Sequence, residues 1–139
     1  MGTKLGDIIK AETIALRDLT DRRIAVDAFN TLYQFLSIIR QPDGTPLKDR
    51  QGRVTSHLSG LFYRNLNLLE HGIQPLYVFD GISPELKTKE IERRRTIRKE
   101  AYKEWKQAQA EGRIEDARKA AQASSRLSTY MIEDAKKLL

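Results

Sequence analysis

Two segments decide the fold: RIAVD at residues 23–27 and IQPLYVFD at residues 73–80. Each has β-branched or aromatic residues at its centre and ends in an aspartate, which predicts two short β-strands. The second is nearly continuous in apolar residues from Leu76, as a parallel strand buried on both faces would be. Pro75 lies near its start, where a missing N–H is tolerated.

Helical patterns surround these strands. Apolar residues recur at helical spacing after the first strand, which predicts an amphipathic helix over about 28–39. The turn-forming run QPDGTP at residues 41–46 ends it. A second helix is expected to start at Thr55 or Ser56 and to end at Gly72. The sequence therefore predicts an α/β protein with a mostly parallel central sheet flanked by helices.

From Pro84 onward the sequence is helical in pattern and highly charged. Gly112 is the expected break between two long helices, the last of which starts at about Glu115. The formal net charge of the chain is +6, and residues 87–106 carry nine basic and four acidic side chains. A concentrated basic helix favours a polyanionic partner. The alternative is a solvated helix with Glu-to-Arg pairs at i, i+4, such as Glu90 with Arg94.

The composition narrows the class of protein. With 139 residues the chain is long enough for one ordinary domain. It has no cysteine, which excludes a disulfide framework and a thiolate metal site. No apolar run approaches the roughly 20 residues of a membrane span, and the N-terminus lacks the pattern of a secretory signal. We therefore expect an intracellular protein without a membrane segment.

Asp27 and Asp80 each follow a predicted strand. Ligands of open α/β sheets bind beyond the carboxyl ends of parallel strands. If the two strands are neighbours, both carboxylates face one crevice, where either one protonates or a cation lies between them. Oxygen ligands favour Mg²⁺ or Mn²⁺. The alternative for each aspartate alone is to cap the following helix.

Several short motifs occur in order along the first hundred residues: Val26-Asp27-Ala28, Tyr33-Gln34-Phe35, Thr55-Ser56-His57-Leu58, Phe62-Tyr63-Arg64 and Val78-Phe79-Asp80-Gly81. They resemble the N-terminal region of flap endonucleases of archaeal type, and the resemblance weakens after Gly112. It implies a PIN-like nuclease domain of mixed α/β structure with a helical arch. In this chain it implies a nuclease region over 1–83, a basic arch over 84–125 and the start of a further nuclease region over 126–139.

The resemblance also implies a reaction. Flap endonucleases cleave DNA at the base of 5′ flaps, with 5′-3′ exonuclease activity, during replication and repair, and use two divalent ions. Mg²⁺ is the expected cofactor, with Mn²⁺ as a substitute. Asp27 and Asp80 match two metal ligands of the family. Lys87 and Arg94 match basic residues that contact the scissile phosphate, where fixed cations stabilise developing charge.

Five further residues match or suit DNA contacts. Tyr33 matches an aromatic that stacks on a terminal base, and its alternative is a boundary tyrosine with a buried ring. Arg98 lies near the same helical face as Lys87 and Arg94. Arg40 and Arg64 suit the DNA backbone, but each taken alone is more typical of an ordinary surface arginine. Gly2 would place a free amine near the cleft if Met1 is removed.

Three other side chains have competing interpretations. His57 and His71 have no partner at ligand spacing, and we expect both to be structural. Trp105 could stack on single-stranded bases or pack helix against helix.

The expected site is incomplete. A two-metal phosphodiesterase site needs more than two carboxylates, and Glu133 and Asp134 match no ligand of the family. We therefore expect this chain alone to be inactive, with the remaining ligands in further residues or in a separate chain of the assembly. The resemblance also implies a sliding clamp as a partner, bound through a C-terminal segment outside these residues.

Two other functions stay open from the sequence. One is a non-catalytic DNA-binding module, since the basic helix is present and half of the acids are not. The other is a small ribonuclease of PIN type, against which the basic helical insertion after Asp80 argues. The expected location is the cytoplasm of an archaeon, or the nucleus if the source is a eukaryote.

Overall fold

The computed structural model describes residues 12–81 and 88–139. None of the helices in these two ranges is long and apolar enough to cross a membrane. From Arg23 to Ala110, strands and helices follow one another as the sequence predicts. In chain order they are a short 3-10 helix η2 (Leu16–Leu19), β1 (Arg23–Asp27), α1 (Ala28–Ile38), α2 (Ser56–Glu70), β2 (Gln74–Val78), α3 (Thr88–Ala110), α4 (Ile114–Ala123) and α5 (Thr129–Leu138).

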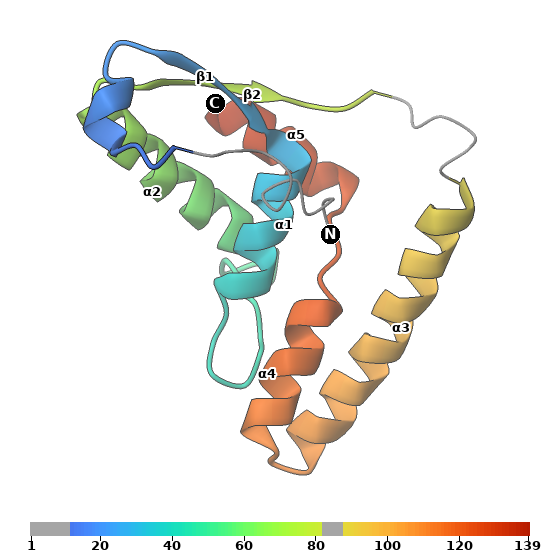
Figure 1. The fold of residues 1–139 in the computed structure, drawn as a ribbon. Helices are drawn as coiled ribbons and strands as arrows, with labels where there is room; N and C mark the ends of the chain where they lie inside the picture. The colour runs from blue at the N-terminus through green and yellow to red at the C-terminus, as the bar shows by residue number, and fades with distance from the viewer. Residues whose placement is uncertain (1–11, 82–87) are drawn as a thin grey trace.

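The two strands are neighbours and run parallel. Arg23 lies opposite Gln74 and Asp27 lies opposite Val78. The connection between them passes through α1 and α2, as a parallel pair requires, because its strands cannot be joined by a tight turn. Helices α1, α2 and α5 gather on one side of the strand pair (Figure 1). The predicted parallel pairing is confirmed.

Within residues 12–81 and 88–139, the opposite face of the sheet is left uncovered. Burial alternates along both strands, and the side chains of Leu76 and Val78 are 63% and 50% exposed. The prediction of a second strand buried on both faces is therefore wrong for this chain. The apolar run has the composition of a two-sided strand, but the described residues supply helices to one face only.

The main core lies between the covered face and the helices. Leu32 and Phe35 of α1, Leu61 of α2 and Ala135 of α5 form it, and Tyr77 and Phe79 pack against it from the second strand region. Gly60 lets α1 and α2 approach closely, because a Cβ there would lie 2.3 Å from Cγ of Phe35. The core thus fixes α1, which begins at the end of β1.

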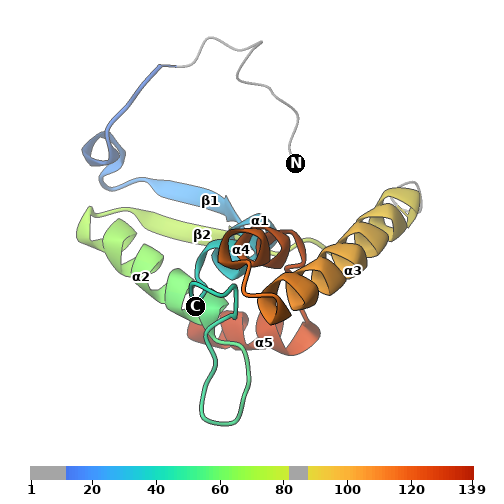
Figure 2. The ribbon, with the colours of Figure 1, turned by 90° about the horizontal axis from the view of Figure 1, so that it is seen from below.

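Helices α3 and α4 form an antiparallel hairpin (Figures 1 and 2). Gly112 has a φ of +70° at its turn, as predicted for the break. Trp105 is 7% exposed and packs against Ala108, Ala117 and Ala121. Of its two interpretations, the structure shows the packing of helix against helix.

The predicted last helix from about Glu115 is wrong, because the chain breaks at residues 124–128 into α4 and α5. The hydroxyl of Ser124 donates to the carbonyl of Ala121, and that of Ser125 donates to the carbonyl of Gln122. Such local bonds from serine compete with helix continuation. This break allows α4 to lie against α1 while α5 returns to α2.

His57 is buried at the start of α2, as expected of a structural residue. Neither ring nitrogen has a hydrogen-bond partner of ordinary geometry within the described ranges. Burial lowers the pKa of His57 below its ordinary value, against smaller opposing effects of Asp134 and the Met131 backbone. His71 is exposed, and its Nδ1 lies 2.7 Å from the carbonyl oxygen of Asn67.

A pH titration of stability tests the burial of His57. The unfolded state binds a proton more readily than the fold, so stability should fall as the pH drops below about 6.5, the ordinary pKa of histidine, and level off below the lowered pKa. His57→Leu should remove this component, and His71→Gln should leave it in place. Urea unfolding between pH 5 and 7.5 measures it. An unchanged pH profile in His57→Leu would show that the ring is protonated without penalty.

Candidate functional site

Two carboxylates lie at one edge of the sheet. Asp27 is the last residue of β1, and Asp80 follows β2 two residues beyond Val78, the partner of Asp27. Both are exposed. Continuing the strand alternation places Asp27 on the face of Ala25 and Asp80 on the face of Leu76 and Val78. Both acids therefore belong to the uncovered face at its carboxyl edge.

The two carboxylates supply some, but not all, of the oxygen ligands that a hard cation such as Mg²⁺ takes. Oδ1 of Asp27 accepts a hydrogen bond from the backbone N–H of Asn30 at 2.9 Å, so the residue also caps α1. That bond orients the carboxylate and leaves Oδ2 for a ligand. Among residues 12–81 and 88–139, however, no group of three or more His, Cys, Asp or Glu side chains could hold a metal ion. Two carboxylates fit Mg²⁺ as part of a shell that water and phosphate complete.

The basic helix α3 carries paired charges near its start. Nε of Arg94 lies 2.9 Å from Oε1 of Glu90, and Nε of Arg93 lies 3.2 Å from the other oxygen. The hydrogen bond from Arg94, with help from Arg93, lowers the pKa of the Glu90 carboxyl. The i, i+4 pair expected from the sequence is therefore present. Lys87 and Gly2 lie outside the described residues, so their predicted roles stay predictions.

Tyr33 and Arg98 are brought together from different helices. The guanidinium carbon of Arg98 on α3 lies 4.9 Å from the centroid of the Tyr33 ring on α1. Both side chains are half-buried. A base that stacks on this face of Tyr33 must displace or share the guanidinium. Tyr33 and Arg98, which are both predicted to contact DNA, thus lie against each other.

The two arginines proposed for the DNA backbone differ sharply. Arg64 is exposed on α2 and borders a groove with Phe35, Ile39 and Tyr63. Arg40 is half-buried, and its guanidinium donates to the carbonyls of Leu36 and Gly44 and to the Ser125 hydroxyl. Arg64 is open to solvent, and its contact with the DNA backbone stays a prediction. The guanidinium of Arg40 forms its hydrogen bonds with other groups of the protein.

The sequence interpretation did not anticipate the role of the loop at residues 41–46. The carbonyl of Asp43 accepts from Nε1 of Trp105 at 3.0 Å, and its carboxylate accepts from Gln109 at 2.9 Å. The signal in the sequence is the run QPDGTP, which predicts a turn. A turn motif gives its own conformation and does not say which distant helix it contacts.

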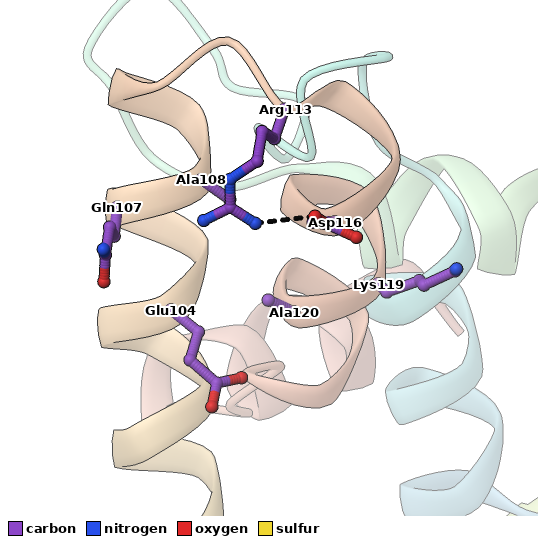
Figure 3. Close-up of a pocket in the computed structure, with 7 residues that line it drawn as sticks. All are labelled: Glu104, Gln107, Ala108, Arg113, Asp116, Lys119 and Ala120. Carbon is purple, nitrogen blue, oxygen red and sulfur yellow. Dashed lines mark hydrogen bonds and ion pairs between the residues drawn. The ribbon is translucent and has the colours of Figure 1, made fainter.

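A concave surface lies between α3 and α4 on the hairpin (Figure 3). The hairpin turn that it borders lies away from the strands (Figure 1). Arg113 reaches from the turn to Asp116, with 2.6 Å between Nη1 and Oδ2, and also pairs with Glu111. Two of the charged side chains that line this surface, Arg113 and Asp116, are therefore paired with each other. We assign no site to this surface.

Comparison with known proteins gives a consistent result. A model of the XPG N-terminal domain matches residues 1–101. The whole chain is 58% identical to the Flap endonuclease 1 of Pyrococcus furiosus, of which it covers 41%. It is similar to the solved flap endonuclease-1 from Methanococcus jannaschii, with a TM-score of 0.63 and 40% identity over 98% of this chain and 43% of that one. The catalytic core of Rad2 in complex with DNA substrate matches with a TM-score of 0.54 and 32% identity, over 88% and 30% of the two chains.

The fold, with two acids at one sheet edge and a basic helical hairpin, is that of the flap-endonuclease class. The chain belongs to the XPG N-terminal domain family. It spans about two fifths of the length of the curated relatives it matches. The family resemblance seen in the motifs of the first hundred residues is confirmed.

The contact between Arg98 and Tyr33 has a measurable energy. A half-buried cation–π pair contributes on the order of 0.5–1 kcal/mol. A double-mutant cycle of Tyr33→Leu and Arg98→Gln on the free energy of unfolding should return a coupling of that size. The same cycle with Arg95→Gln, an exposed neighbour on α3, should return none. Equal coupling for both arginines would show that general charge, and not this contact, is responsible.

Proposed function

We propose that the whole protein is a Mg²⁺-dependent, structure-specific nuclease that hydrolyses phosphodiester bonds at the base of 5′ flaps, with 5′-3′ exonuclease activity, in archaeal DNA replication and repair. The observation that carries the proposal is the position of Asp27 and Asp80 at one sheet edge. The start of the basic helix α3 follows Asp80 by only a few residues. A cation site and a surface for a polyanion are therefore close together along the chain.

Each residue has a chemical role in this proposal. Asp27 and Asp80 would hold divalent ions, which supply an activated water and neutralise charge on the phosphate. Arg94 would stabilise the phosphate charge, after exchanging its partner Glu90 for the substrate. Lys87 is assigned the same task from the family resemblance alone. Tyr33 would stack on a terminal base where the duplex bends.

The remaining contacts concern DNA binding. Arg98 and Arg64 would contact the DNA backbone, and Gly2 would lie near the cleft. A sliding clamp is the proposed protein partner through residues beyond this chain. A DNA substrate in replication and repair implies an intracellular location.

Asp80→Asn tests the metal role with little change of shape. Loss of one ligand charge should lower the cleavage rate of flapped DNA by roughly a thousandfold, equivalent to about 4 kcal/mol. Affinity for the same DNA, measured with Ca²⁺ in place of Mg²⁺, should stay within about threefold of wild type. Single-turnover cleavage and fluorescence anisotropy supply the two measurements.

Glu133→Gln is the matched control, because Glu133 is an exposed acid on α5. It should cleave like wild type. Equal loss of binding and cleavage in Asp80→Asn would mean that the residue supports the fold or the DNA contact and does not bind a metal. Cleavage of single-stranded RNA in preference to flapped DNA would favour a PIN-type ribonuclease.

We further propose that residues 1–139 alone bind flapped DNA without cutting it. The support is the basic helix together with only two candidate metal ligands in the described part of the chain. The affinity for flapped DNA should fall steeply between roughly 50 and 200 mM salt, as it does for other proteins that contact phosphates. Calorimetry should find no tight Mg²⁺ site. Mg²⁺-dependent cleavage by this chain would contradict the proposal.

A further inference from the structure

Arg40 connects three separate parts of the chain. Its Nε donates to the carbonyl of Leu36 at 2.7 Å, at the end of α1. Its Nη1 donates to the carbonyl of Gly44 at 2.7 Å, in the loop at 41–46. Its Nη2 donates to the hydroxyl of Ser125 at 2.9 Å, in the break after α4. Each guanidinium nitrogen therefore has a partner inside the protein.

The surroundings of Arg40 are those of an internal group. Ser125 is 6% exposed and also accepts from the hydroxyl of Ser37. The guanidinium carbon lies 5.8 Å from the centroid of the Trp105 ring. Burial lowers the pKa of Arg40, but arginine stays charged at neutral pH. The charge is thus stabilised by hydrogen bonds to carbonyl and hydroxyl oxygens inside the protein.

The loop that Arg40 holds is itself attached to α3. Asp43 accepts from Trp105 and Gln109, as described above. Gly44 has a φ of +82°, and a Cβ there would lie 2.5 Å from Cβ of Ala121 on α4. The loop therefore lies directly against both helices of the hairpin. Arg40 contacts this loop and the end of α4 at once.

We propose that Arg40 is a positioning residue for the proposed nuclease reaction, and that it holds the α3–α4 hairpin against α1 through the 41–46 loop and Ser125. The inference rests on the proposed function. It replaces the expectation that Arg40 contacts the DNA backbone. The hairpin position matters because Arg94 and Arg98 lie on α3.

A rigid helix transmits this position to the DNA-facing residues. Arg98 lies seven residues before Trp105 on α3, which is about 10 Å of helix. A shift of Trp105 against the loop therefore moves Arg98 relative to Tyr33. It also moves Arg94 relative to the acids at the sheet edge. Misplacement of catalytic groups by about 1 Å can lower a rate by about a hundredfold.

Arg40→Lys in the full-length protein distinguishes a role in positioning the hairpin from a contact with a DNA phosphate. Lysine keeps the charge, so it would preserve a phosphate contact, but it cannot reproduce three bonds from a planar guanidinium. We expect the single-turnover rate constant on flapped DNA with Mg²⁺ to fall roughly tenfold. The KM and the salt dependence of DNA binding should stay as in wild type. Ser125→Ala, which removes one of the three partners, should lower the same rate constant by less.

Two comparisons make the measurement specific. Arg118→Lys, an exposed arginine on α4, should match wild type in every readout. Arg64→Gln should instead raise KM and reduce the salt slope by about one, as loss of a phosphate contact does. A merely structural role of Arg40 would lower the amplitude of the single turnover, which counts folded enzyme, and leave its rate constant unchanged.

The outcomes are distinct. Wild-type behaviour of Arg40→Lys, with a raised KM and a reduced salt slope in Arg40→Gln, would overturn the inference in favour of a phosphate contact. Loss of amplitude alone would overturn it in favour of stability. If wild type itself fails to cleave flapped DNA, the proposed function fails. Amide hydrogen exchange of residues 41–47 and 104–110 then tests the inference by itself. Faster exchange in Arg40→Lys than in Arg118→Lys supports it, and equal exchange overturns it.

Discussion

The parallel hydrogen bonding of β1 to β2 is the constraint on which the rest of the structure depends. Parallel strands cannot be joined by a tight turn, so α1, the loop that follows it and α2 must all lie between them. The same pairing places both carboxyl ends at one edge, which brings Asp27 and Asp80 together although 53 positions separate them in the sequence. Because Asp27 also caps α1, the strand end, the acid and the start of the helix form one unit.

The second element of the site is attached independently of the sheet. Helix α3 begins after Asp80, and its far end is held by the 41–46 loop through Trp105 and Gln109. Arg40 connects that loop to α1 and to Ser125. The acid edge and the basic helix are therefore positioned by different contacts, although both sets of contacts include α1. This arrangement would let a nuclease align phosphate-binding cations with its metal ligands.

Local pattern predicted much of the fold, because helix and strand periodicity are properties of neighbouring residues. The parallel pair, α1, α2 and the break at Gly112 follow from such patterns. The break at 124–128 was missed because two serines end a helix only when their hydroxyls bond back to the chain. The exposed face of β2 was missed because an apolar run does not show what covers it. In the site, Asp27 and Asp80 could be predicted because each ends a strand motif. The hydrogen bonds of Arg40 could not, because one of its partners, Ser125, lies 85 positions away and leaves no signal in the neighbouring sequence.

Whether Asp27 and Asp80 share one cation is the central question, and paramagnetic broadening by Mn²⁺ addresses it most directly. Amide resonances of residues 27–30 and 79–81 are followed as Mn²⁺ is added to the DNA-free protein. Two carboxylates at one sheet edge predict that both segments broaden together with a single midpoint, and that Asp27→Asn shifts the midpoint for both. Broadening of the two segments at separate concentrations, or of one segment alone, would contradict a shared site.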